Sequence, residues 1–122
     1  MRMTKVYRKI KPRLSNYVRV VMKGAPEEVV KKCTYKITAN DERVDFYGNS
    51  YAGAKFLKDE VEPIAGFGDG LKPILYAFRD MKIADYEQLK KANNDFRDEE
   101  SRFILEENMT LLAVFGLKDT IR

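Results

Sequence analysis

The sequence predicts a single domain of the α+β class, and three observations support that prediction. The chain has 122 residues, of which 44% are hydrophobic and 34% are charged, as in ordinary globular domains. Stretches near both ends have the alternating or uninterrupted apolar pattern of β-strands, whereas the middle has the three- and four-residue spacing of amphipathic helices. No internal repeat or low-complexity tract divides the chain, so we expect these elements to share one core.

The first expected element is a β-hairpin. Apolar and polar residues alternate over 3–10 and again over 16–23, and Pro12 interrupts the alternation in the connecting loop at 11–15. Residues 1–23 hold eight of the 23 Lys and Arg residues and no acid, which leaves 15 basic against 19 acidic residues downstream. This basic hairpin is expected to face either solvent or an anionic partner.

A short helix and two short strands are expected next. Pro26 suits a first helical turn, and Glu27 and Glu28 would lie near the positive end of the helix dipole. The apolar residues that follow have one-turn spacing, which predicts a helix that ends before a strand at 34–38. A polar turn then leads to a short return strand at 44–47.

An amphipathic helix is expected over 50–65, with a kink or restart at Pro63 because proline disrupts helical hydrogen bonding. The glycine-rich segment 66–70 lies between this helix and a strand, the reverse of the strand–glycine–helix order of a phosphate-binding loop. It is therefore expected to cap the helix. Segment 71–79 is expected to be a strand that is at an edge or bulged, since Pro73 has no N–H to donate.

The last third is expected to contain two short helices, at 86–93 and 101–108, and a buried strand at 109–118, which carries a continuous apolar run. Its acidic residues are expected to form a solvated surface rather than a cation site, because they lack the spacing of a calcium loop and alternate with arginines. They are Asp95, Asp98, Glu99, Glu100, Glu106 and Glu107.

The composition excludes several kinds of chemistry. The chain has no histidine and one cysteine, Cys33, so it has no Ser-His-Asp or Cys-His pair, no His or multi-Cys zinc site and no intrachain disulfide. An unpaired cysteine fits a reducing compartment. The longest apolar run, 111–116, is far shorter than the roughly 20 residues of a membrane helix, and no secretion signal is visible. We therefore expect that the 122-residue chain makes no contact with a membrane.

The connection between the strand at 16–23 and the helix after it is the main candidate site. Gly24 would let a ligand approach the backbone closely, and Lys23 would supply a mobile positive charge. Glu27 and Glu28 would repel a phosphate placed at the start of the helix, so a flat neutral group such as a base is favoured there. An ordinary strand–helix connection explains the same residues equally well.

Four ordered segments resemble motifs of P-type ATPase nucleotide-binding domains. Residues 23–27, Lys-Gly-Ala-Pro-Glu, are similar to the KGAPE motif of the cation-pumping, calcium-pump-like branch. Residues 2–6 resemble the strand that precedes that motif, and 69–77 resemble the family's D-x-L-R-x-L-x-x-A strand. Residues 109–122 resemble the N-L-T segment that ends in D-P-x-R, where the family's chain returns to the phosphorylation domain. The four segments together cover nearly the whole chain.

The resemblance implies a largely antiparallel sheet flanked by helices, which the strand and helix pattern allows. It implies that residues 1–118 are part of a nucleotide-binding domain and that 119–122 begin the hinge to the phosphorylation domain. It places Lys23, Gly24 and Ala25 at the adenine and ribose end of an ATP pocket, Met3 and Ile74 on its apolar wall, Lys72 at the phosphates, and Asp119 and Arg122 on the hinge.

The sequence also departs from the family pattern. Lys72 stands where the family usually has arginine, which removes a bidentate phosphate contact, and Thr120 and Ile121 replace the proline pattern of the hinge. The phosphorylatable Asp-Lys-Thr-Gly-Thr sequence and the upstream aromatic residue that stacks on adenine are missing. The chain is therefore expected to be a piece of a longer protein and to hydrolyse no ATP by itself.

The function implied by the resemblance is to hold ATP in the cytosolic part of an integral membrane cation pump, a calcium-type, ion-translocating hydrolase. ATP would be presented to an aspartate outside this chain, with Mg²⁺ shared at the γ-phosphate, and the partners would be the pump's phosphorylation and actuator domains. A lipid flippase of the same family is one alternative. A nucleic-acid-binding module is another, in which Tyr7 and Tyr17 of the basic hairpin 1–23 stack on bases.

Overall fold

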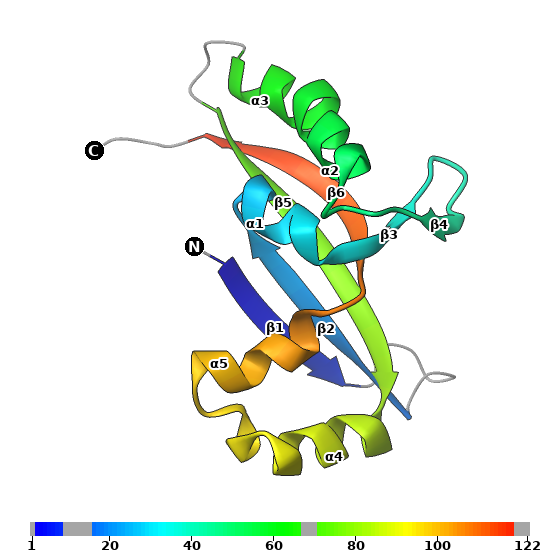
Figure 1. Ribbon diagram of the computed structural model, residues 1–122, viewed down its shortest axis with the longest axis vertical. Helices are drawn as coiled ribbons and strands as arrows, with labels where there is room; N and C mark the ends of the chain where they lie inside the picture. The colour runs from blue at the N-terminus through cyan, green and yellow to red at the C-terminus, as the bar shows by residue number, and fades with distance from the viewer. Residues whose placement is uncertain (1, 9–15, 67–70, 119–122) are drawn as a thin grey trace.

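The centre of the fold is a six-stranded sheet whose order is β1-β2-β5-β6-β3-β4 (Figure 1). The computed structural model describes residues 2–8, 16–66 and 71–118. All neighbouring strands are antiparallel except β3 and β6, which are parallel. The strands are β1 (Arg2–Arg8), β2 (Tyr17–Gly24), β3 (Cys33–Ile37), β4 (Arg43–Asp45), β5 (Leu71–Lys82) and β6 (Met109–Lys118).

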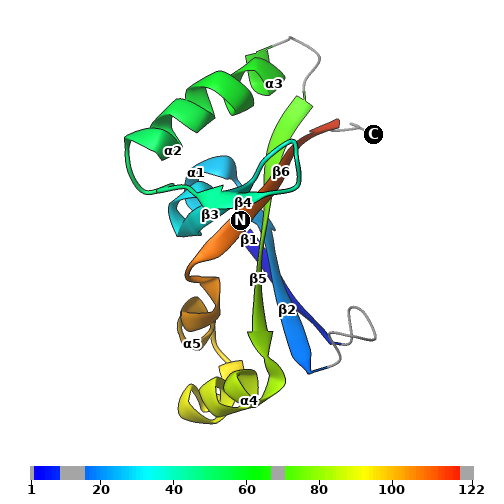
Figure 2. The same cartoon turned by 90° about the vertical axis from the view of Figure 1, so that its right-hand side faces the viewer.

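The described helices lie on one face of the sheet, and none of them covers the opposite face (Figure 2). This arrangement confirms the predicted α+β class with a largely antiparallel sheet flanked by helices, although the helices flank it on one side. The helical segments are α1 (Pro26–Val29), η2 (Val30–Lys32), α2 (Tyr51–Phe56), η3 (Leu57–Val61), α3 (Glu62–Gly66), α4 (Ile83–Ala92), η4 (Asn94–Phe96), α5 (Glu99–Arg102) and η5 (Phe103–Glu106).

The core lies between the helices and the sheet. Alternate residues of β2 are fully buried, namely Val18, Val20 and Met22, and the residues between them are half-buried. Leu75 and Ala77 of β5 are also completely buried, since they lie opposite Gly24 and Met22 and therefore point to the same face. The alternation along β2 distinguishes a helix-covered face from a second face that carries the remaining side chains.

The predicted hairpin is confirmed, because β1 and β2 pair antiparallel with Met3 opposite Lys23. The predicted short helix after Lys23 is present as α1 and η2, and the expected strands around the polar turn are β3 and β4. The helix predicted over 50–65 is continuous but contains a π-helical turn, η3, immediately before the turn that holds Pro63. A wider turn leaves room for the proline ring beside the carbonyl groups of the preceding turn. The expected glycine cap at 66–70 lies largely outside the described residues.

The position of β5 corrects one prediction. This strand is not at an edge, since it pairs with β2 on one side and with β6 on the other. Pro73 is tolerated because β2 ends at Gly24, opposite Leu75, so β5 at Pro73 is paired with β6 and not with β2. The bulge in this part of the sheet lies instead between Tyr76 and Ala77, where β6 contains the extra residue.

The burial of β6 corrects a second prediction. Met109 and Leu111 are buried, as expected, but Leu112 and Phe115 are 52% and 51% exposed and Leu117 is 49% exposed. The apolar run suggested a strand covered on both faces, whereas none of the described helices lies over one of these faces. The second half of β6 is therefore an exposed apolar surface in this part of the chain.

Two glycines allow a close backbone contact between the β4–α2 connection and η2. The N–H of Gly48 donates to the carbonyl oxygen of Cys33 at 3.0 Å. A Cβ atom at Gly48 would lie 2.9 Å from that oxygen and would overlap the carbonyl oxygen of Val30, and a Cβ at Gly53 would overlap the backbone of Gly48. Glycine is required at both positions because no side chain has room there.

Candidate functional site

The candidate site begins where β2 ends and the chain turns into α1. Lys23 is half-buried, Gly24 is buried, and Ala25 precedes Pro26, the first residue of the helix. The carbonyl oxygen of Ala25 accepts hydrogen bonds from the N–H groups of Glu28 and Val29, at 3.0 and 3.1 Å. This turn is therefore held in place by the first helical hydrogen bonds, and Lys23 projects from a fixed strand end.

The sheet register aligns the predicted pocket residues on one face. Met3 of β1 lies opposite Lys23 of β2, and Lys23 lies opposite Tyr76 of β5. Residues two and four positions before Tyr76 share its face, because side chains alternate along a strand, and these residues are Ile74 and Lys72. Ile74 is half-buried and Lys72 is exposed. Positions from three strands, far apart in sequence, therefore share the sheet face that the described helices leave uncovered.

The start of α1 is unsuitable for a phosphate. The helix has four residues, and Glu27 and Glu28 in its first turn are both exposed. Acidic side chains there favour the helix but repel a bound anion. The structure thus separates the acidic helix start from Lys72, which lies four residues along β5 from the Lys23–Tyr76 pair.

Two aromatic residues of this face were not among the predicted site residues. Tyr76 lies beside Lys23, and its ring meets that of Phe115 in β6 with centroids 5.3 Å apart and planes at 90°. Tyr76 could have been predicted from the sequence, because it continues the two-residue period of Lys72 and Ile74 along the strand. Phe115 could not be predicted in this way, because its place on the face is known only from the register of β5 and β6, in which Phe115 lies opposite Ile74.

An ion pair lies on the same face, at the other end of β2 and β5. The Arg19 guanidinium donates two hydrogen bonds to the Asp80 carboxylate, at 2.8 and 2.9 Å, and lies 4.5 Å from the centroid of the Phe78 ring. The hydrogen bond to Asp80 raises the pKa of Arg19 above its ordinary value. The positive charge of Arg19 therefore offsets the negative charge of Asp80 on this face.

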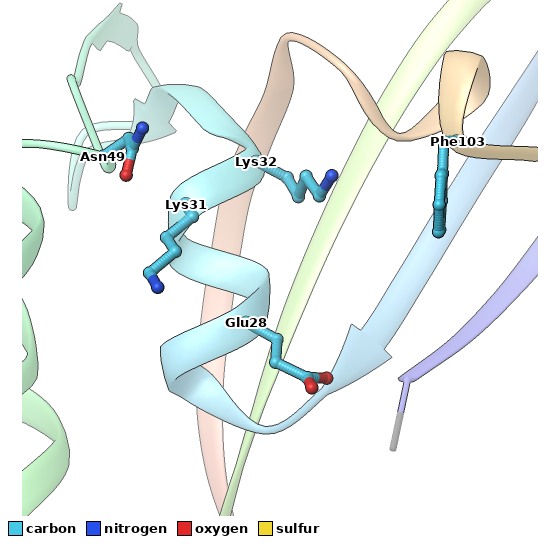
Figure 3. A pocket seen from close by; sticks show the side chains of 5 residues that line it. All are labelled: Glu28, Lys31, Lys32, Asn49 and Phe103. Carbon is cyan, nitrogen blue, oxygen red and sulfur yellow. The ribbon is translucent and has the colours of Figure 1, made fainter. Parts of the chain in front are cut away.

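A surface pocket of about 430 Å³ lies on the opposite, helical side of the molecule (Figure 3). Lys32 points from η2 toward Phe103, with its Nζ atom 5.4 Å from the centroid of the ring. The pocket is lined by Glu28, Lys31, Lys32, Asn49 and Phe103. None of the residues predicted to bind nucleotide contributes to it, so it is separate from the candidate site.

The acidic residues near the C-terminal end correct a further prediction in part. Asp95, Asp98, Glu99, Glu100 and Glu107 are exposed, as a solvated surface requires, but Glu106 is 2% exposed. Asp98 accepts a hydrogen bond from the Ser101 N–H at 2.7 Å and caps α5, and this bond lowers the pKa of Asp98. Glu106 was predicted to belong to this solvated acidic surface, but it ends η5 just before β6 enters the core.

Cys33 has a structural position. Its Sγ atom donates to the carbonyl oxygen of Val29 at 3.4 Å, and burial raises the pKa of the thiol to about 12. No group of three or more His, Cys, Asp or Glu side chains suited to a metal ion occurs within the described segments. The predicted hinge residues Asp119 and Arg122 lie outside the described residues. No helix in the described part of the chain is long and apolar enough to span a bilayer.

Comparisons with known proteins show the family to which this chain belongs. Residues 2–122 match the family described as P-type ATPase, cytoplasmic domain N. Over 104 residues the chain is 31% identical to the plasma membrane calcium-transporting ATPase 1 of Homo sapiens and to that of Sus scrofa, and this covers 85% of the chain. The matched segment is 8% of the length of each relative. The chain belongs to the family of cytoplasmic N domains of cation-type P-type ATPases.

Proposed function

We propose that this chain is the ATP-holding part of a cation-transporting P-type ATPase and that it presents ATP to a phosphorylation-site aspartate outside residues 1–122. The observation that carries the proposal is the sheet register, which aligns Met3, Lys23, Ile74 and Lys72 on one face of the sheet beside the Gly24–Ala25 turn. The base would lie at Lys23 and Gly24, and the phosphates would extend along β5 toward Lys72. Since the named relatives are calcium-transporting ATPases, calcium is the proposed cargo of the whole pump.

The electrostatics support this orientation of the ligand. Glu27 and Glu28 lie at the helix start next to the base end, where a negative phosphate would be repelled. Lys72 is exposed and four residues from Tyr76, so it can reach an anion about 13 Å from the base end along the strand. Lysine supplies a point charge without the two-pronged geometry of arginine, so phosphate contact here depends on charge more than on direction.

Magnesium, the other domains and the membrane enter this proposal only through the intact protein. In the intact pump, Mg²⁺ would be shared at the γ-phosphate of ATP, where it would offset the negative charge. The phosphorylation and actuator domains would be the partners, and the domain would lie on the cytosolic side, as the description of the family implies. The part assigned to this chain is to bind and orient ATP, with no bond-breaking step on its own residues.

The proposal is tested by titrating the 122-residue chain with ATP and following its backbone amides by NMR. We expect the amides of Lys23, Gly24 and Ala25 to shift together with those of Lys72 and Ile74, since both groups border the same site. A shift of the first group alone would contradict the proposed position of the phosphates. Titration with adenosine should shift the first group and leave the amide of Lys72 unchanged.

The alternatives predict different results. A nucleic-acid-binding module would bind single-stranded RNA more tightly than ATP through hairpin residues 1–23, and its affinity would fall steeply with salt. A base-binding pocket loses little affinity over the same range of salt. The similarity to calcium-transporting ATPases favours a cation pump over the lipid-flippase branch.

A further inference from the structure

The connection between β4 and α2 has the composition of a protein-binding loop. Residues 47–51 read Tyr-Gly-Asn-Ser-Tyr. The binding loops of antibodies are enriched in these four residue types, because tyrosine supplies a large rigid contact surface and the small residues supply adaptable hydrogen bonds. Tyr47 and Tyr51 are 65% and 81% exposed, more than any other large apolar side chain in the described part of the chain. The fold therefore presents two tyrosine rings to solvent from one short loop.

This loop is held in one conformation by its own hydrogen bonds and by its contact with the neighbouring backbone. The N–H of Gly48 donates to the carbonyl oxygen of Cys33 at 3.0 Å, and the Ser50 hydroxyl donates to the carbonyl oxygen of Tyr47. The close backbone contacts at Gly48 and Gly53 leave no space on that side of the loop. A partner would therefore meet a preorganised surface and would lose little affinity to the ordering of the loop.

Three surface pockets meet beside this loop, with volumes of about 430, 260 and 460 Å³. Lys31 and Asn49 line all three. In Figure 3 the side chain of Lys31 extends away from Phe103, whereas that of Lys32 points toward it. Glu28 lines the first pocket, and no other described carboxylate lines any of the three. Since no carboxylate among the described residues pairs with Lys31, its charge is available to an anionic group.

Thr34 adds an unsatisfied hydroxyl group to the 460 Å³ pocket, which it lines together with Lys31. Its Oγ1 atom is buried and has no hydrogen-bond partner within the described residues. Rotation about the Cα–Cβ bond carries a threonine hydroxyl through three staggered positions, so it can turn to donate to a group that enters the pocket. An anionic group held by Lys31 would supply the acceptor that Thr34 lacks in the free chain.

A fourth pocket, of about 410 Å³, determines which side of the loop an anion would occupy. Tyr47 lines this pocket as well as the 460 Å³ pocket, so its ring lies between them. Three carboxylates and two lysines are among the residues that line the fourth pocket, namely Asp45, Asp59, Glu60, Lys36 and Lys55. The excess of carboxylates opposes an anion there, whereas Lys31 attracts one on the other side of Tyr47.

We propose that residues 47–51 and Lys31 form a docking surface for an acidic protein segment. A carboxylate side chain of the partner lies between Lys31 and Thr34, and the adjoining part of the partner packs on Tyr47 and Tyr51. A free small anion would engage only the lysine and the hydroxyl, whereas a protein segment also covers the two rings, and exposed tyrosines are typical of protein interfaces. None of the residues proposed to bind ATP lines these pockets, so this inference is independent of the proposed function.

The test titrates the 122-residue chain with two synthetic pentapeptides and follows its backbone amides by NMR. The first peptide alternates glutamate and leucine, and the second has glutamine in place of each glutamate. We expect the glutamate peptide to shift the amides of Lys31, Thr34 and 47–51 and to leave those of Lys23 and Lys72 unchanged. The glutamine peptide and sodium acetate should each bind roughly tenfold more weakly, because one lacks the charge and the other lacks the contact with the rings.

Substitutions at exposed positions separate the charge from the rings. Lys31→Ala should weaken binding of the glutamate peptide by roughly tenfold. Lys58→Ala is the matched control, since Lys58 is also exposed but lines none of the four pockets. Tyr47→Ala and Tyr51→Ala should weaken binding of the peptide but leave binding of acetate unchanged, because the rings contact the partner outside the carboxylate.

Thr34→Val tests the unsatisfied hydroxyl through two measurements. Valine has the shape of threonine without the hydroxyl, so binding of the glutamate peptide should weaken by roughly threefold to tenfold. The free chain should unfold at the same or a higher urea concentration, since no hydrogen bond within the chain is lost. A lower urea midpoint for Thr34→Val would show that the hydroxyl already has a partner, and would overturn its assigned role.

Four other results would overturn the docking proposal. They are equal binding of the two peptides, acetate binding as tight as that of the glutamate peptide, unchanged peptide binding by Lys31→Ala, and no shifted amide with the glutamate peptide at concentrations up to about 10 mM. If the peptide binds as expected but ATP shifts no amide, the proposed function fails and the docking surface is supported. The two proposals therefore fail on different measurements.

Discussion

The contact between the β4–α2 connection and η2 predicts a large difference between two glycine-to-alanine substitutions. A Cβ at Gly48 would lie 2.9 Å from the Cys33 carbonyl oxygen and would overlap the carbonyl oxygen of Val30, both of which are backbone atoms. Its φ lies outside the left-handed region, so alanine suits the local conformation and only the space is missing. The two backbone segments would have to separate by roughly 1 Å in a region packed as densely as a crystal.

The expected cost of Gly48→Ala follows from these contacts. Overpacking costs about 1–3 kcal/mol, and the upper end applies here because backbone atoms cannot rotate away. Separation of the segments also breaks the hydrogen bond from the Gly48 N–H to Cys33, which contributes about 1 kcal/mol. We therefore expect the free energy of unfolding to fall by about 3–4 kcal/mol.

Gly116→Ala in β6 is the matched control. Its Cβ would lie 2.9 Å from Cγ2 of Ile64 and 3.2 Å from Cδ1 of Leu71, which are the ends of movable side chains. Alanine also loses less backbone entropy than glycine in a strand, so the change in stability should stay within about 1 kcal/mol of zero. Urea unfolding followed by circular dichroism measures both variants. Equal stability of Gly48→Ala and Gly116→Ala would refute the close backbone contact at Gly48.

Three further predictions concern the ligand, the thiol and catalysis. Lys23→Ala should weaken ATP and adenosine alike by about 1–2 kcal/mol, whereas Lys72→Ala should weaken ATP alone and Lys72→Arg should strengthen it, as calorimetry or NMR titration would measure. Since burial raises the pKa of Cys33 from 9.0 to about 12, the thiol should react with thiol reagents only on unfolding, and its contribution to stability should be complete below pH 9 and disappear as the pH rises to about 12. Cys33→Ala should abolish that pH dependence, and a thiol that reacts rapidly in the folded chain would contradict its burial. The chain should release no phosphate from ATP and Mg²⁺ above background, and turnover of even roughly 1 per second would require a catalytic group that we have not identified.

Local elements could be predicted from the sequence because local patterns determine them. Alternation identified the hairpin strands β1 and β2, and Pro26 with two acidic residues identified the start of α1. The strand predicted over 109–118 has the bounds of β6. Strand order is not local, however, and no pattern in the sequence indicates that β3 pairs parallel with β6 or that β5 lies inside the sheet. The prediction from Pro73 was wrong for this reason, since a proline is tolerated at this position of β5 only because β2 ends before reaching it.

The candidate site was partly accessible to the same reasoning. The resemblance supplied Lys23, Lys72 and Ile74, and the two-residue period of β5 extends that set to Tyr76. Phe115 could not be found in this way, because its place beside Tyr76 depends on a register between strands about forty residues apart. Exposure of β6 was missed for a related reason, since an apolar run gives no sign of which layers cover it.

The parallel pairing of β3 with β6 also has a consequence for folding kinetics. Strands β3 and β4 are joined to the three strands β1, β2 and β5 only through β6, the last element that the structure describes. The sheet is therefore two separate pieces, β1-β2-β5 and β3-β4, until the final strand inserts between them. Contacts between segments so distant in sequence close slowly, so we expect folding on the millisecond-to-second scale of high-contact-order domains. During synthesis, the facing edges of β3 and β5 remain unpaired until the ribosome has released Met109–Lys118, and unpaired strand edges are where chains aggregate.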